Sequence, residues 1–148
     1  MGPTILLLNG PNLSALGTRE PRIYGTTTLA EVVARCRGAA EAAGATLVDM
    51  QSNHEGALID FLQQHAAADG AIINPGGLAH TSVVLRDAVA AFLSPVVEVH
   101  ISDIAAREPF RHHSYLVDVT AHQVIGKGVA GYEEALAWLL THLKERGT

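Results

Sequence analysis

The chain has little cysteine and no long apolar run. Cys36 is its one cysteine, so no disulfide can form within the chain, and we expect it to be a buried or half-buried thiol. No apolar stretch approaches the roughly 20 residues that span a bilayer, and the short one that begins at Thr4 has neither a basic flank nor a cleavage site. These absences predict a cytoplasmic protein without a membrane partner.

Positive charge is scarce as well. Lysine and arginine total 10 against 15 aspartates and glutamates, which gives a formal charge of -5 with the eight histidines neutral. The basic residues form no stripe that could neutralise a phosphate backbone. Nucleic acid is therefore not an expected partner.

Several catalytic motifs are missing too. The chain has no GxxxxGK[ST], no GxSxG and no HExxH, and its neighbouring histidines 112 and 113 would point apart in regular structure. A GxGxxG pattern does occur at 126–131, but no strand with a ribose-binding acid can follow it, so we interpret it as a turn. No metal site is expected.

What the chain does have is 48% hydrophobic residues, arranged in alternating strand-like and helix-like segments. Capping boxes are predicted at Thr28 with Glu31 and at Ser52 with Glu55, and Thr81 is the expected cap of a third helix. The predicted strands cover 4–9, 45–51, 71–74 and 95–101, with a weaker one within 116–126, and the predicted helices cover about 29–44, 53–69, 82–93 and a segment around 135–143.

Connections of helical length require parallel pairing of the strands, with helices on both faces of the sheet. The predicted fold class is α/β: one flavodoxin-like domain over residues 1–148, with a doubly wound, five-stranded parallel sheet in the strand order 2-1-3-4-5. In such folds ligands bind beyond the carboxyl ends of the strands, here between the first and third strands.

Unusual polar residues follow or end these strands, as in NGPN at 9–12 and NPGGLAHTS at 74–82. Glu98 and His100 occupy alternate positions of an apolar strand and so share one face. Burying either side chain is costly unless each satisfies the other, so a buried pair is predicted. A purely structural pair is the alternative, but the place at a strand's carboxyl end favours a functional one.

The segment 13–27 is longer than an ordinary β-α connection, where roughly 2 to 6 residues suffice, and this suggests a lid. It carries Arg19, Arg22 and Tyr24 between glycines 17 and 25. A guanidinium beside a phenol favours the phenolate, a base usable at neutral pH. On these residues alone, an exposed loop tyrosine is the commoner explanation.

Six blocks of residues run through the chain in order. They are NGPNL at 9–13, REP at 19–21 with YG at 24–25, NPG at 74–76, HTS at 80–82 with LRD at 85–87, EVHIS at 98–102, and ARE at 106–108 with FR at 110–111 and HSY at 113–115. Together they closely resemble the type II 3-dehydroquinase family over essentially the whole chain.

The resemblance implies a reversible anti dehydration of 3-dehydroquinate to 3-dehydroshikimate through an enolate, without a cofactor. Tyr24 would be the base, with Arg19 promoting its ionisation. His100 would be the acid, oriented by Glu98, and Asn12 would hold a water on the enolate oxygen.

The same resemblance implies the binding of a small-molecule substrate and a homo-oligomer, a dodecamer built from trimers. The residue at position 87 would reach into the adjacent subunit's site, and Arg107 would belong to the mobile closure. The substrate-binding positions implied are Asn74, His80, Asp87 and Arg111 for the hydroxyls, and the backbone of Ile101 and Ser102 for the carboxylate.

Some positions depart from the family pattern, namely Ser14, Ala15, Asp103, Ala105 and Pro109. They leave the behaviour of the lid open. Two other functions also remain open, because a fold does not fix a function. One is a flavodoxin-like binding module without turnover, and the other is a lyase or isomerase acting on a different ring acid.

Overall fold

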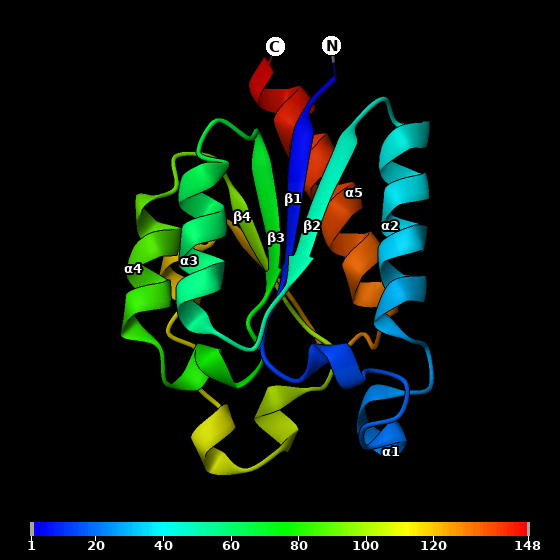
Figure 1. Cartoon of the computed structure of the whole chain (residues 1–148), viewed down its shortest axis with the longest axis vertical. Helices are drawn as coiled ribbons and strands as arrows, with labels where there is room; N and C mark the ends of the chain where they lie inside the picture. The colour runs from blue at the N-terminus through cyan, green and yellow to red at the C-terminus, as the bar shows by residue number, and fades with distance from the viewer. Residues whose placement is uncertain (1, 148) are drawn as a thin grey trace.

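A central parallel sheet organises the molecule, and the computed structural model describes residues 2–147 of it (Figure 1). The strand order is β2-β1-β3-β4-β5 and each pair is parallel, which confirms the predicted fold class. The strands are β1 (Thr4–Asn9), β2 (Thr46–Gln51), β3 (Gly70–Asn74), β4 (Val96–His100) and β5 (His122–Ile125).

Helices cover both faces of the sheet, so the molecule has three layers (Figure 1). Helices α2 and α5 pack together on one face, and α3 and α4 pack together on the other. The helices are α1 (Pro21–Tyr24), α2 (Leu29–Ala42), α3 (Glu55–Gln64), α4 (Val83–Ala91) and α5 (Ala130–Gly147). Among the described residues, no helix combines the length and the apolar character needed to cross a bilayer.

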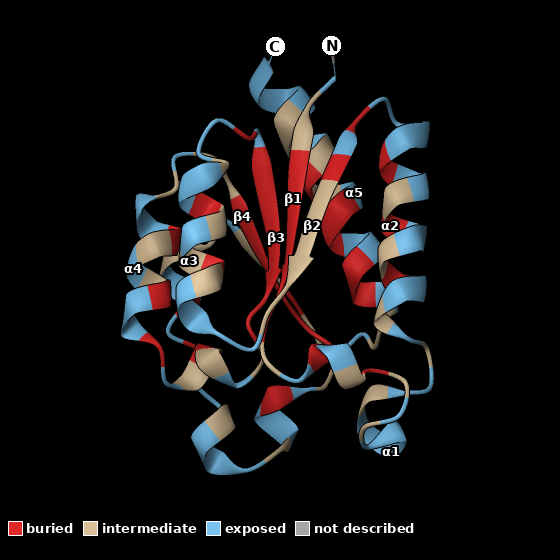
Figure 2. Cartoon of the chain, viewed as in Figure 1, coloured by how far each residue is buried: buried red, intermediate tan, exposed pale blue. Residues whose placement is uncertain are grey.

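The core lies on both sides of the central strands, and these strands are buried along nearly their whole length (Figure 2). Successive side chains of a strand point to opposite faces. In β1, Ile5 and Leu7 therefore join the core under α2 and α5, while Leu6 and Leu8 join the core under α3 and α4. Each fully buried aliphatic side chain contributes roughly 1.5–3 kcal/mol, so this alternation holds the two layers to one sheet.

The first predicted helix cap is confirmed and the second is wrong. Thr28 Oγ1 accepts from the Glu31 backbone N–H at 3.2 Å, and Glu31 Oε1 accepts from the Thr28 N–H at 3.2 Å. Helix α3 instead begins after His54 without a side-chain cap, because Ser52 accepts from the His54 N–H and the Glu55 carboxylate accepts from a distant hydroxyl, that of Ser82.

Two further helix boundaries differ from the prediction. Ser82, not Thr81, caps α4, since its Oγ accepts from the Leu85 N–H at 3.0 Å while residue 81 closes the preceding 3-10 turn. Helix α3 ends at Gln64, several residues before the predicted end at 69. There Asp69 accepts from the Thr4 backbone N–H at 2.8 Å, so its segment binds the start of β1 instead of continuing the helix.

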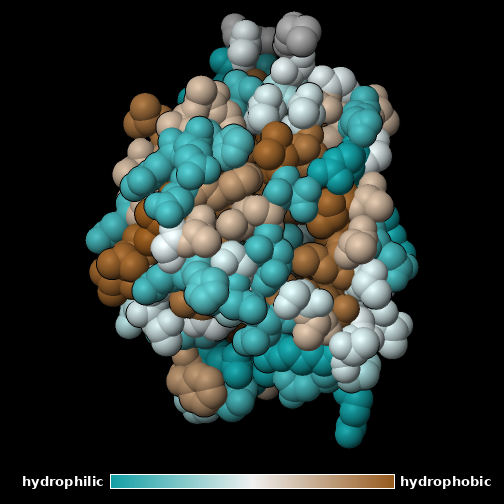
Figure 3. All heavy atoms as spheres, in the orientation of Figure 1, coloured by the Kyte–Doolittle hydropathy of each residue, from teal (hydrophilic) through white to brown (hydrophobic). Residues whose placement is uncertain are grey.

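The polar connections form short helical turns beyond the carboxyl ends of the strands, at the bottom of Figure 1. Segment 13–27 holds a 3-10 turn and the one-turn helix α1, and segment 102–114 holds two 3-10 turns. The visible surface at this end of the molecule is largely hydrophilic (Figure 3). These turns enclose the candidate site.

Candidate active site

A polar pocket lies where β1, β3 and β4 end. Most of the predicted site residues line it: Asn12, Arg19, Tyr24, Asn74, His80, His100, Ile101, Ser102, Arg107 and Arg111. Glu98 lies directly behind His100, and Asp87 is the one predicted residue that stays away from the pocket of its own chain. No group of three or more potential metal ligands occurs in the part of the chain that the structure describes.

Two glycines let the loops after β1 and β3 meet backbone to backbone. The Gly10 N–H donates to the Asn74 carbonyl at 2.8 Å, and a Cβ at Gly10 would lie 2.6 Å from the Pro75 carbonyl oxygen. Gly76 has a φ of +58°, which favours glycine, and a Cβ there would lie 3.0 Å from the Pro11 carbonyl oxygen. Any larger residue at position 10 would push apart the two loops that carry the pocket.

Asn12 is held in a left-handed conformation, with a φ of 72°. Its backbone N–H donates to Asn53 Oδ1 at 3.0 Å, and Gln51 donates to the same oxygen at 3.1 Å and to the Gly10 carbonyl at 3.1 Å. Sequence reasoning missed Gln51 and Asn53, although the first ends and the second follows a predicted strand whose end lies beside that of β1.

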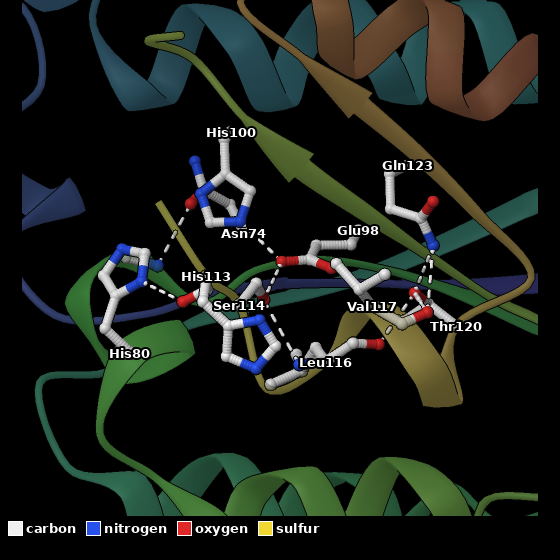
Figure 4. A network of polar contacts seen from close by, with 11 residues as sticks. Asn74, His80, Glu98, His100, His113, Ser114, Leu116, Val117, Thr120 and Gln123 are labelled. Carbon is white, nitrogen blue, oxygen red and sulfur yellow. Dashed lines mark hydrogen bonds and ion pairs between the residues drawn. The ribbon is translucent and has the colours of Figure 1, made fainter. Parts of the chain in front are cut away.

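Glu98 and His100 form the predicted buried pair on β4. His100 Nε2 lies 2.5 Å from Glu98 Oε2, and the two side chains are 5% and 0% exposed (Figure 4). Ser114 Oγ donates to the same carboxylate oxygen at 2.5 Å, a contact that the sequence did not indicate. Since a carboxylate accepts, Nε2 carries a hydrogen and Nδ1 is the ring nitrogen left for other partners.

His80 lies beside this pair, and a hydrogen bond determines its tautomer as well. Its Nδ1 donates to the His113 carbonyl at 2.8 Å, and its ring stacks on that of His100 with centroids 6.3 Å apart (Figure 4). Burial, the largest influence, lowers the pKa of His80 from its ordinary 6.5. His80 is therefore neutral at pH 7, and its Nε2 is a hydrogen-bond acceptor.

Two arginines flank Tyr24. Arg107 Nη1 donates to the Tyr24 hydroxyl at 2.6 Å and to Ser102 Oγ at 3.3 Å. Arg19 lies over the Tyr24 ring, with its guanidinium carbon 4.8 Å from the centroid, and pairs with Glu20 at 3.6 Å. The predicted proximity of Arg19 to Tyr24 is confirmed, but the cation on the phenol oxygen is Arg107, which lies 83 residues away in the sequence.

Arg111 and Asp87 complete the predicted set. Arg111 lines the pocket and is held by Glu108, whose Oε1 accepts from its Nε at 2.9 Å. The Asp87 side chain is 62% exposed on α4 and pairs with Arg86 at 3.2 Å. Val83 and Val84 lie four and three residues before it on the same helix, and these apolar residues are 55% and 53% exposed.

The comparisons with known proteins agree with one another. A family model described as dehydroquinase class II matches residues 3–140. A catabolic 3-dehydroquinase 1 of Neosartorya fischeri is 54% identical over 147 residues, 99% of this chain and 98% of that protein. A 3-dehydroquinate dehydratase of a Janthinobacterium species is 52% identical over 145 residues, 97% of this chain and 100% of the relative.

Solved structures give the same result. The type II dehydroquinase of Propionibacterium acnes superposes with a TM-score of 0.91 at 42% identity, covering 95% of this chain and 98% of that one. Both the sequence match and the structural match therefore extend over nearly the full length. The chain belongs to the class II dehydroquinase family.

Proposed function

We propose that this chain is a 3-dehydroquinate dehydratase, a hydro-lyase that reversibly converts 3-dehydroquinate to 3-dehydroshikimate by anti elimination. The observation that carries the proposal is that one pocket holds two proton-transfer groups, each with a charged partner in contact. Arg107 donates to the Tyr24 hydroxyl at 2.6 Å, and the Glu98 carboxylate lies 2.5 Å from His100. The names of the relatives are consistent with this reaction.

In the proposed mechanism, Tyr24 as phenolate removes the proton next to the ketone. Arg107 contacts the phenol oxygen and Arg19 lies over the ring, so both positive charges favour the phenolate. The electrons of the broken C–H bond form an enolate, whose oxygen receives a hydrogen bond from a water held by Asn12.

The departing hydroxyl then leaves with a proton from His100. Because Nε2 of that ring is committed to Glu98, the proton comes from Nδ1. Glu98 stabilises the positive ring and holds its orientation, as the aspartate does in a catalytic triad. The enolate collapses to the conjugated enone, and water is the second product.

Substrate binding uses the remaining polar groups of the pocket. A neutral His80 accepts from a substrate hydroxyl through Nε2, and Asn74 and Arg111 donate to substrate oxygens. The backbone N–H groups of Ile101 and Ser102 bind the carboxylate. A polyhydroxylated ring acid needs many directional partners of this kind.

The proposal extends to assembly and location. The chain acts in the cytoplasm as a homododecamer built from trimers, and Asp87 completes the site of a neighbouring subunit. Its exposed position on α4, one turn after the exposed Val83 and Val84, suits such a contact. The physiological role is either quinate catabolism or the shikimate pathway.

Ultraviolet absorbance during incubation with 3-dehydroquinate tests the reaction, because the product is a conjugated enone. We expect a band that grows with wild-type protein. Binding of 3-dehydroquinate without a growing band would instead indicate a binding module. Turnover of another ring acid in a substrate panel, with none of 3-dehydroquinate, would indicate a different lyase or isomerase.

A further inference from the structure

Tyr132 lies directly behind the pocket and takes no part in the mechanism proposed above. It belongs to the first turn of α5, and its side chain is 0% exposed. Its hydroxyl oxygen lies 2.7 Å from Asn9 Oδ1 and 2.8 Å from Asn74 Nδ2. Asn9 and Asn74 are paired across β1 and β3, so one phenol joins the ends of the two central strands.

These hydrogen bonds can run in only one direction. The Gly76 backbone N–H can only donate, and it donates to Asn74 Oδ1 at 3.1 Å. The amide nitrogen of Asn74 must then face Tyr132, and the phenol oxygen accepts from it. Since a phenol has one proton, that proton goes to Asn9 Oδ1.

We infer that Tyr132 is a positioning residue for the reaction: its hydroxyl, together with the Gly76 backbone N–H, holds the Asn74 amide so that an N–H group, and not the carbonyl oxygen, faces the substrate. Asn74 has two N–H hydrogens, and Tyr132 receives one of them. The other belongs to a side chain that lines the pocket beside His80 and His100 (Figure 4). This inference rests on the proposed role of Asn74 in binding substrate.

The amide of Asn9 supports this reading. Asn9 is 0% exposed, and its Nδ2 has no hydrogen-bond partner within the described part of the chain. A buried N–H without a partner is costly, and a leucine of similar size would avoid that cost. What asparagine adds at position 9 is the oxygen that receives the Tyr132 proton.

The direction of the hydrogen bonds from Asn74 through Tyr132 to Asn9 does not depend on pH in the range of an enzyme assay. Burial, the largest influence, raises the pKa of Tyr132. The group therefore keeps its proton and continues to donate to Asn9.

The first experiment compares Tyr132→Phe with the wild type in steady-state kinetics with 3-dehydroquinate. The variant keeps the ring but removes the acceptor of the Asn74 N–H. We expect kcat/KM to fall about five- to thirtyfold, mostly through KM and equally at pH 6.5 and 8.5. Leu136→Val is the matched control, since Leu136 is a buried residue one turn further along α5 without polar contact to the pocket.

If Leu136→Val raises KM as much as Tyr132→Phe does, Tyr132 acts only through stability and the inference is wrong. Asn9→Leu keeps the tyrosine ring and breaks the same chain of bonds at its other end. It should raise KM in the same way, and it carries the test if Tyr132→Phe does not fold. An Asn9→Leu protein with wild-type KM would overturn the inference.

A double-mutant cycle separates positioning from general damage. Asn74→Ala is made in the wild type and in Tyr132→Phe, and kcat/KM is measured for all four proteins. We expect Asn74→Ala to cost much less in the Tyr132→Phe background, because there the amide is already misplaced. Additive losses would overturn the inference alone, whereas wild-type kinetics of the Asn74→Ala single variant would overturn the proposed role of Asn74 as well.

Discussion

Tyr24 differs from phenylalanine by one atom, and that atom is the proposed base. We expect Tyr24→Phe to retain the fold and to bind substrate while kcat falls by ~10²–10⁴, the usual contribution of a positioned acid or base. The ring keeps its contact with the Arg19 guanidinium, so the pocket wall is preserved. Stopped assays for turnover and calorimetric titration for binding measure the two effects separately, and a near-normal kcat would refute the assignment.

The Cys36 thiol makes the free energy of unfolding depend on pH at alkaline pH. Burial, the largest influence, raises the pKa of this thiol from 9.0 to about 11, and the thiol is fully buried. The folded state therefore disfavours the thiolate, and the resulting stability is present below pH 9 and is lost as the pH rises toward 11.

The expected loss attributable to Cys36 is about 2–3 kcal/mol, at 1.36 kcal/mol for each pKa unit. Urea unfolding of wild type and Cys36→Ala between pH 8 and 11 measures it. The free energy of unfolding should fall more steeply for the wild type. Parallel curves would show that the thiol titrates alike in the folded and unfolded chains.

Residues close in the sequence were predictable as partners, and distant ones were not. Glu98 and His100 share a strand face because side chains alternate along a strand, so their pairing follows from position alone. Arg107 meets Tyr24 across 83 residues, and Tyr132 meets Asn9 across 123. Local patterns carry no information on such contacts, since these depend on how whole elements pack.

At the scale of a secondary-structure element, the N-terminal cap of helix α4 can be tested. Ser82 caps its first turn through the Leu85 N–H and also donates to the Glu55 carboxylate at 2.6 Å, which links the starts of α4 and α3. We expect Ser82→Ala to lower the free energy of unfolding by about 1–2 kcal/mol, as cap removal usually does. Thr81→Ala is the control and should be nearly neutral, because residue 81 is exposed and closes the preceding turn only through its backbone N–H, which alanine keeps. Equal losses in the two variants, measured at one protein concentration, would contradict the cap assignment.

The strands were easier to predict than the helix ends. Buried parallel strands appear as continuous apolar runs closed by Gly, Pro or Asn, and β1 matches its prediction residue for residue. The start of α3 was mispredicted because Glu55 can accept either from its own helix end or from Ser82. Only the packing of α3 against α4 decides between these partners.

For the whole molecule, the proposed assembly predicts rescue between two inactive proteins. If Asp87 of one subunit completes the site of another, a mixture of Tyr24→Phe and Asp87→Ala subunits contains some interfaces with both residues intact. We expect each variant to be nearly inactive alone and the mixture to recover part of the activity after subunit exchange. Mass spectrometry of the intact complexes verifies the exchange. No recovery after verified exchange, or full activity of a monomer in sedimentation, would contradict the shared site.

The proposed acid and base are attached to parts of the fold with very different local stability. His100 ends β4, a strand buried along its whole length, whereas Tyr24 ends α1, a four-residue helix without a buried residue. The backbone hydrogen bonds of such short, exposed helices break far more readily than those of a central strand, and their amide hydrogens exchange faster with solvent. On warming, α1 should therefore open while the sheet stays intact. Activity would then be lost reversibly below the temperature of global unfolding, with rapid deuterium uptake at 21–25 and persistent protection at 96–100.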